Sequence, residues 1–224
     1  CPEASFINLS TNKVYGDNPN KLDIREMATR FEVSKKSKYF KKGIDESMSL
    51  DNCTHSFFGS AKLSSDMYVQ EFGKNLKLNT VTFRGGCLTG ENHSSVELHG
   101  FLSYIVKTLI NNKPYNVFGY KGKQVRDNIH SSDLINCFWE YFKNPKSGEI
   151  YNIGGGRKNS CSVLEVINVM KKKYNSKSKI NFLKKNRTGD HIWWITDNSK
   201  FSKDYPNWKI SFSLDKIITK IAKQ

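Results

Sequence analysis

The order of strand-like and helical segments at the start of the chain constrains the fold more than any other feature. Ser5–Leu9 is an apolar run of strand length, and a polar turn (STNKVYGD, residues 10–17) follows it. A helical pattern from Asp51 onward leads to a β-branched strand at residues 79–83, which ends in a glycine turn at residues 84–90. This succession predicts a parallel βαβ arrangement and an α/β fold.

The rest of the chain continues to alternate between the two kinds of segment. The pattern predicts helices at residues 96–112, 132–142, 162–174 and 214–222, and strands at residues 115–118, 149–153 and 180–183. Residues 18–50 are polar, and we expect a long surface connection there with one amphipathic piece.

The helix expected after Asp51 carries the first candidate for chemistry. Asp51 and Asn52 offer capping groups. Apolar residues then recur at helical spacing: Phe58, Ala61, Met67 or Tyr68, and Phe72. Phe58 and Lys62 are one turn apart and share a face. A lysine there can hold a cofactor, whereas the simple alternative is a surface lysine one turn from a core phenylalanine.

Composition excludes several classes of protein. The chain has 224 residues, 37% of them apolar, which is enough for a globular core. No apolar run approaches the roughly 20 residues of a membrane span, so we expect no membrane partner. The net charge of +15 comes from lysines spread over the whole length, which favours compositional bias over nucleic-acid binding. Five widely spaced cysteines without a CxxC indicate free thiols, no metal site and a cytoplasmic location.

Five polar stretches, in this order, resemble the extended short-chain dehydrogenase/reductase family of NAD-dependent nucleotide-sugar epimerases and dehydratases. The stretches are STNKVYGD (10–17), HSFFGSAK (55–62), KQVRDNIH (123–130), YNIGG (151–155) and RTGD (187–190). Within the family, the first and third look most similar to the CDP-paratose (CDP-tyvelose) 2-epimerases.

The resemblance implies a fold, a division into domains and an assembly. The fold is the C-terminal portion of a doubly wound, Rossmann-like parallel sheet with a smaller substrate-binding domain. Residues 1–83 and 129–155 would belong to the dinucleotide-binding domain, and residues 84–128 and 156–224 to the nucleotide-sugar-binding domain. A homodimer is also implied, because the helix of the second stretch pairs in relatives.

The resemblance also implies roles for individual residues. Thr11 would hydrogen-bond the sugar hydroxyl that is oxidised, and Lys62 and Ser10 would contact NAD. Arg126 and Arg187 would clasp the substrate diphosphate, for which the planar guanidinium is suited. The remaining substrate contacts implied are Asp190, at the nucleotide ribose, and Cys87. The implied reaction removes a hydride from a sugar carbon, forms a ketone and returns the hydride to the opposite face.

Three features depart from the family pattern. No Gly-rich pyrophosphate loop occurs in this sequence, so we expect the first half of the dinucleotide-binding domain to precede Cys1, and the chain by itself to bind NAD poorly. Phe58 stands where the family has its catalytic tyrosine, which leaves Tyr15, His55 or a water on Lys62 as alternative proton carriers, or no chemistry at all. Cys87 stands where many members have a substrate-binding asparagine. A catalytically silent sugar-nucleotide-binding relative is therefore the alternative to an epimerase, and another dehydratase or reductase of the family is a further one.

Overall fold

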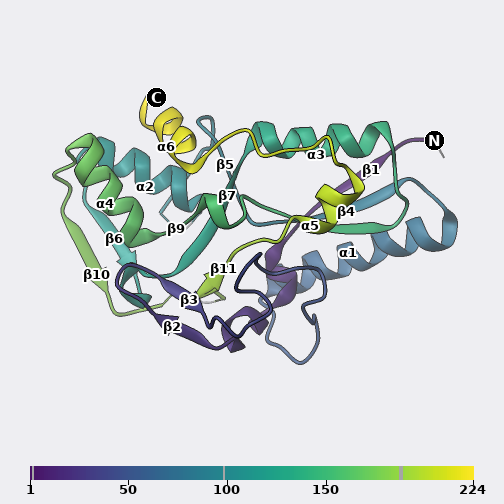
Figure 1. The fold of residues 1–224 in the computed structure, drawn as a ribbon, viewed down its shortest axis with the longest axis horizontal. Coiled ribbons are helices and arrows are strands. Elements are labelled where there is room, and N and C mark those ends of the chain that lie inside the picture. The colour runs from purple at the N-terminus through teal and green to yellow at the C-terminus, as the bar shows by residue number, and fades with distance from the viewer. Residues whose placement is uncertain (2, 98, 187–188) are drawn as a thin grey trace.

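The computed structural model describes residues 1, 3–97, 99–186 and 189–224 (Figure 1). Its helices are α1 (Phe57–Leu76), α2 (Phe101–Ile110), α3 (Ser131–Lys143), α4 (Val163–Tyr174), α5 (Ser199–Asp204) and α6 (Leu214–Ala222). Its strands are β1 (Phe6–Thr11), β2 (Ile24–Glu26), β3 (Phe31–Val33), β4 (Thr80–Gly85), β5 (Cys87–Thr89), β6 (Tyr115–Phe118), β7 (Val125–His130), β8 (Glu149–Ile153), β9 (Ser160–Ser162), β10 (Ile180–Leu183) and β11 (Trp193–Trp194). None of the helices in these ranges is long and apolar enough to cross a bilayer.

A parallel sheet in the order β1-β4-β8 carries the fold, which confirms the predicted α/β class and the βαβ arrangement. Figure 1 shows α1 and α3 on opposite sides of this sheet. The alternation of side chains along β4 explains why. Val81 and Phe83 pack in the apolar cluster that contains Tyr141 of α3, whereas Thr80 and Arg84 bond to α1.

Helix α1 begins later than expected and buries an unexpected face. Its N-cap is Ser56, whose Oγ accepts from the Gly59 amide at 3.1 Å, so the cap predicted at Asp51 and Asn52 is wrong. The helix buries Gly59, Asp66, Val69 and Gly73 instead of its periodic aromatic side chains. Those side chains are exposed: Phe58 is 56% exposed, and Met67, Tyr68 and Phe72 are exposed as well.

The segment of residues 18–50 is not the surface connection that its polarity predicts. It contains the antiparallel pair β2–β3 and a bridge between Ile44 and Thr196. Val33 and Ile44 are buried in one cluster with the indole rings of β11. Tryptophans far along the chain therefore supply the core that this polar segment lacks by itself.

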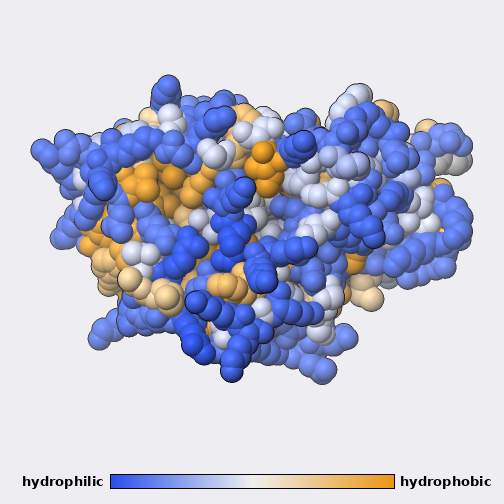
Figure 2. Space-filling model, viewed as in Figure 1, coloured by the Kyte–Doolittle hydropathy of each residue, from blue (hydrophilic) through white to orange (hydrophobic). Residues whose placement is uncertain are grey.

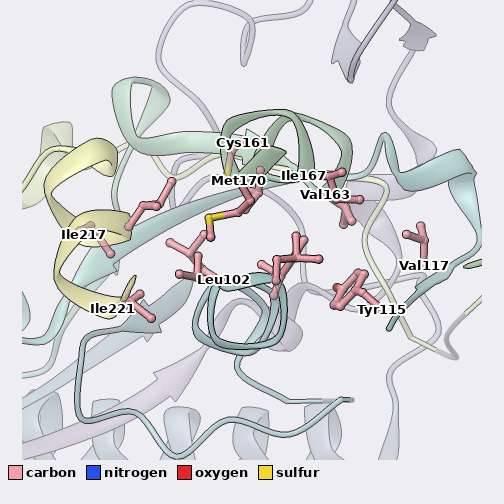
Figure 3. Packing of buried hydrophobic residues seen from close by; sticks show 14 residues of the cluster. Leu102, Tyr115, Val117, Cys161, Val163, Ile167, Met170, Ile217 and Ile221 are labelled. Atoms are coloured by element: carbon pink, nitrogen blue, oxygen red, sulfur yellow. The ribbon is translucent and has the colours of Figure 1, made fainter. Parts of the chain in front are cut away.

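A second group of elements surrounds β7, which pairs with β5, β9 and β11. Helices α2, α4 and α6 pack together there around Leu102, Met170 and Ile217 (Figure 3). Helix α2 begins at Phe101, after Gly100 at φ 77°, so the start predicted at Val96 is wrong. Figure 2 shows a mostly hydrophilic face with apolar surface gathered where Figure 1 places α2, α4 and β6.

The remaining predicted elements agree closely with the structure. The strands β6, β8 and β10 and the helix α6 have the predicted bounds. Helix α3 extends one residue beyond prediction at both ends, and α4 begins one residue later than predicted. Ser162, expected as the first residue of its helix, is the N-cap of α4. The predicted division into two domains stays a prediction.

Candidate active site

A cleft of about 640 Å³ opens at the carboxyl ends of β1 and β4. Parallel sheets place ligands at this edge, because the loops that follow neighbouring strands meet there. The cleft is lined by residues from β1, the first two turns of α1, β5, the start of α2 and β7. Residues singled out in the sequence that line it are Ser10, Thr11, Phe58, Lys62, Cys87, Arg126 and Asp190. Arg187 lies outside the described residues.

The end of β1 presents two hydroxyl groups. Thr11 caps the short helical turn of residues 12–15, and its Oγ1 accepts from the Lys13 amide at 3.3 Å and donates to Asn12 Oδ1 at 3.4 Å. Ser10 is 5% exposed, and its Oγ has no hydrogen-bond partner within the described part of the chain. Because a buried hydroxyl costs free energy unless it is bonded, Ser10 Oγ is ready for a ligand atom.

Helix α1 brings Phe58 and Lys62 to the same cleft. The Lys62 ammonium group donates to the Leu9 carbonyl at 3.0 Å, which ties the helix to the end of β1. The alternative reading of Phe58 as a core residue is wrong, since the ring is more than half exposed. The helix therefore places a cation and an apolar ring beside the strand-end hydroxyls.

Neither side chain that could replace the missing tyrosine is among the cleft residues. The Tyr15 hydroxyl is fully buried, donates to Asn152 Oδ1 at 2.8 Å and accepts from Arg84 Nη1 at 2.9 Å. Burial raises the pKa of Tyr15 to about 12. His55 Nε2 lies 2.8 Å from the Val14 carbonyl. Of the alternatives predicted, a water on Lys62 and the loss of chemistry stay compatible with this geometry.

Arg126 and Asp190 form a buried ion pair at one end of the cleft. Arg126 Nη2 lies 2.5 Å from Asp190 Oδ1, and the two side chains are 9% and 14% exposed. The loop around Asp190 is fixed to the turn after β1, because Lys13 Nζ donates to the Gly189 carbonyl and Asn20 Nδ2 to the Asp190 carbonyl. The first and last of the five stretches are thus joined, although Lys13 and Gly189 are 176 positions apart in the sequence.

The strand pair β5–β7 contributes a thiol and an amide. Cys87 lines the cleft, and burial raises the pKa of its thiol to about 11, so the thiol is protonated at neutral pH. Asn128 lines the same cleft, is fully buried, and its Oδ1 has no partner among the described residues. Sequence reasoning missed Asn128. Strand alternation gave the signal, because residues 126 and 128 share a face.

Two histidines at the start of α2 were also missed. His93 and His99 line the cleft, and their rings meet edge to face with centroids 5.6 Å apart. Burial lowers the pKa of His93, and His99 adds to this effect. A neutral imidazole can accept a hydrogen bond from a sugar hydroxyl.

The residues present fit the nicotinamide end of NAD and nothing beyond it. The Lys62 ammonium group and the unpartnered Ser10 hydroxyl are donors suited to a ribose or carboxamide oxygen. The sequence has no Gly-rich loop for the pyrophosphate. The described residues could thus hold one end of the cofactor.

Residues 2–154 match the NAD dependent epimerase/dehydratase family. The chain belongs to this family. Among curated proteins, it is 33% identical over 173 residues to CDP-paratose 2-epimerase from Salmonella typhi, covering 74% of this chain and 49% of that protein. It is 24% identical over 212 residues to dTDP-glucose 4,6-dehydratase from Escherichia coli, covering 91% of this chain and 53% of that protein. The chain spans about half the length of these relatives.

Solved structures of the NAD-dependent family share the fold. A dTDP-glucose 4,6-dehydratase from Bacillus anthracis, in complex with NAD, superposes with a TM-score of 0.75 at 19% identity, over 99% of this chain and 61% of that chain. A UDP-glucose 4-epimerase from Thermotoga maritima, with UDP-glucose, gives a TM-score of 0.73 at 20% identity, over 98% of this chain and 62% of that chain. At this identity the likeness shows the Rossmann-type fold alone.

Proposed function

We propose that the natural full-length protein epimerises a nucleotide-diphosphate sugar, with NAD as cofactor, by transient oxidation to a ketone. The single observation that carries the proposal is the convergence of Thr11, Lys62 and the Arg126–Asp190 pair on one cleft at the end of a parallel sheet. In this proposal Thr11 offers a hydroxyl group to the sugar, and Lys62 offers a cation to the cofactor ribose. The Arg126–Asp190 pair forms a site for the nucleotide. NAD supplies the chemistry of accepting the hydride and returning it to the other face.

Each residue has a distinct task in this proposal. Thr11 orients the sugar hydroxyl, Arg126 and Arg187 grip the diphosphate, and Asp190 meets the nucleotide ribose. Cys87 and Asn128 lie beside the sugar, and Lys62 and Ser10 hold the nicotinamide end. A water hydrogen-bonded to Lys62 relays the hydroxyl proton to solvent and back, since Phe58 has no group that can carry it.

The substrate we propose is CDP-paratose, epimerised at carbon two of the sugar. The similarity to CDP-paratose 2-epimerase supports this choice. The test incubates the full-length protein with CDP-paratose and NAD. We expect CDP-tyvelose to form, and neither product nor exchange at carbon two would overturn the assignment.

A catalytically silent relative that only binds the nucleotide-sugar is the second candidate, because Phe58 lines the cleft where a proton carrier is expected. Replacing Phe58 with tyrosine separates the two. A gain in turnover of about 10²-fold or more supports the silent relative, since positioned acid–base catalysis contributes 10²–10⁴-fold. Unchanged turnover in an already active protein supports the water on Lys62.

The proposal extends to a cytoplasmic homodimer that pairs through α1. Supporting it, an apolar groove of about 490 Å³ lies between this helix and β1, lined among others by Phe6, Tyr68 and Phe72. Met67 and Leu76 of α1 are exposed as well, and apolar side chains gathered on one exposed helix face favour an interface. Tyr68→Glu should give a monomer by sedimentation, whereas Glu71→Lys, also on the exposed part of α1, should leave the dimer intact.

A further inference from the structure

A narrow slot opens beside the cleft and shares three of its residues, Phe101, Arg126 and Asp190. The other residues that line it are Glu97, Tyr115, Val117, Phe118, Gln124 and Val163. The slot therefore meets the cleft at the proposed diphosphate site. A ligand held at Arg126 can extend into the cleft in one direction and into the slot in the other.

Gln124 is the residue of this slot whose buried side chain has an unpartnered polar atom. It is 7% exposed, and its Nε2 donates to the Phe118 carbonyl at 3.4 Å. Its Oε1 is buried and has no partner among the described residues. A buried amide oxygen without a donor costs free energy. Rotating the amide by half a turn would exchange Oε1 and Nε2, and Nε2 would then lose its bond to the Phe118 carbonyl.

Resting on the proposed function, we propose that the slot takes the pyrimidine base of the nucleotide-sugar and that Gln124 Oε1 accepts a hydrogen bond from the 4-amino group of cytosine. Uracil and thymine present an acceptor oxygen at this position, which would face Gln124 Oε1 without a proton between them. Gln124 thus selects cytidine nucleotides.

The position of Gln124 on the chain agrees with this assignment. Gln124 directly precedes β7, two residues before Arg126, so both side chains lie on the same side of the strand about 7 Å apart along it. A base one ribose away from a diphosphate at Arg126 falls within that reach. Glu97 adds a carboxylate to the same slot, so a second acceptor there also favours a base edge that donates.

The walls and the size of the slot suit a single ring. Phe101, Phe118 and Val117 are apolar, and the space that they enclose is about 50 Å³. The slot is therefore narrow, and its apolar walls suit the flat face of one ring. The turn after β6 holds Tyr120 and Lys121 at φ 50° and 55°, a left-handed conformation that costs free energy in non-glycine residues.

Equilibrium binding of CDP and UDP, measured by calorimetry on the full-length protein without sugar substrate, tests the proposal. We expect CDP to bind at least about tenfold more tightly than UDP. Gln124→Leu should weaken CDP binding by about the same factor and abolish the preference. Gln224→Leu, the same change at an exposed glutamine near the C-terminus, should leave both affinities unchanged.

The wild-type protein provides an independent arm should Gln124→Leu fail to fold. The diphosphate of a pyrimidin-2-one nucleoside, which lacks the 4-amino group, should bind about as weakly as UDP. Equal affinity for CDP and UDP, no binding of CDP, or a preference retained in Gln124→Leu would overturn the inference. A clear preference for CDP without epimerisation would instead reject the proposed reaction and leave the base-reading role of Gln124 standing.

Discussion

Cys87 of β5 and Asn128 of β7 lie opposite each other in parallel register, and both line the cleft. One contributes a protonated thiol and the other a buried amide oxygen without a partner among the described residues. Neither can serve as a base at neutral pH. The pair therefore offers hydrogen-bonding groups to the cleft, but no general base.

The thiol of Cys87 should react slowly with iodoacetamide. Burial raises its pKa to about 11, and only the thiolate is nucleophilic. At pH 8 we expect alkylation at least about 100-fold slower than at the exposed Cys1, with a rate that rises about tenfold per pH unit up to pH 10. Peptide mass spectrometry of a time course gives both rates. Equal rates at pH 8 would show that the thiol is not shielded in this way.

Arg126 should not tolerate lysine. A guanidinium can bond a phosphate with two N–H groups and Asp190 with a third, and an ammonium group lacks this planar fork. We expect Arg126→Lys to weaken CDP binding at least about tenfold, a loss of about 1.4 kcal/mol or more. Arg25→Lys is the matched control, because Arg25 is 67% exposed and is not among the residues that line the cleft. Similar losses in both variants would point to overall charge instead of the fork.

Removing one partner of the buried ion pair between Arg84 and Asp66 should destabilise the protein strongly. Arg84 Nε donates to Asp66 Oδ2 at 2.7 Å, and the side chains are 1% and 0% exposed. Arg84→Met leaves a carboxylate buried without its cation, and we expect a loss of about 3–5 kcal/mol in the free energy of unfolding. Urea titration measures it. The double variant Arg84→Met with Asp66→Leu should recover most of the loss.

A surface pair serves as the control for that experiment. Lys21 and Asp17 lie 3.3 Å apart with about half of each side chain exposed. Lys21→Met should change the free energy of unfolding by less than about 1 kcal/mol, because solvent screens exposed charges. A loss as large as that of Arg84→Met would mean that net charge, and not burial, governs both effects.

Helix α1 shows which features of this fold the sequence predicts and which features it does not. The periodicity locates the helix, yet the aromatic side chains that create it are exposed. The helix meets the sheet through Gly73 and the ion-paired Asp66, and its Gly59 packs on the turn after β1. A pattern of hydrophobicity cannot reveal a contact made by glycines and a paired charge. It succeeds for β6, β8 and α6, whose apolar residues do form the core.

The same limit applies to the cleft. Strand-end positions and family motifs predict Ser10, Thr11, Lys62, Cys87 and Asp190, and the structure places them around one cleft. Tyr15 follows Thr11 by about one turn of the chain, and its side chain is buried. No sequence pattern shows whether a tyrosine at this position is buried or exposed. His99 comes from a segment that was expected to be helical and is not, and His93 lies just before that segment.

Replacing Gly73 with alanine should destabilise the protein, although Gly73 lies within helix α1. Alanine is favoured over glycine in helices by about 1 kcal/mol. A Cβ on Gly73, however, would lie 2.3 Å from the Gly148 nitrogen and 2.4 Å from Thr80 Oγ1, so the helix would have to move away from β4. We expect Gly73→Ala to lower the free energy of unfolding by about 1–3 kcal/mol, as overpacking does, whereas Ser60→Ala on the exposed side should not. Urea midpoints distinguish the two outcomes, and a stabilised Gly73→Ala would contradict the close approach.

Asp127 should make the protein less stable as the pH rises from 4 to 7. Its Oδ2 accepts from the Gly156 and Thr196 amides at 2.8 and 3.0 Å, but the residue is fully buried, and burial raises its pKa to about 6. A carboxyl group whose pKa is higher in the folded than in the unfolded state binds its proton more tightly when folded. Its contribution is therefore complete below pH 3.8 and is lost as the pH passes 6, a change of about 3 kcal/mol.

The variant Asp127→Asn isolates this contribution, because asparagine keeps an oxygen for the two amides and does not titrate. Relative to the wild type, the variant should gain stability steadily between pH 4 and 7 in urea titrations. Asp17→Asn should do the opposite, since the amide of Thr54 and the ammonium group of Lys21 lower the pKa of Asp17, and the wild-type carboxylate stabilises the fold more as the pH rises. Parallel wild-type and Asp127→Asn profiles would show that the pKa of Asp127 is the same in the folded and unfolded states, so that the two amides offset its burial.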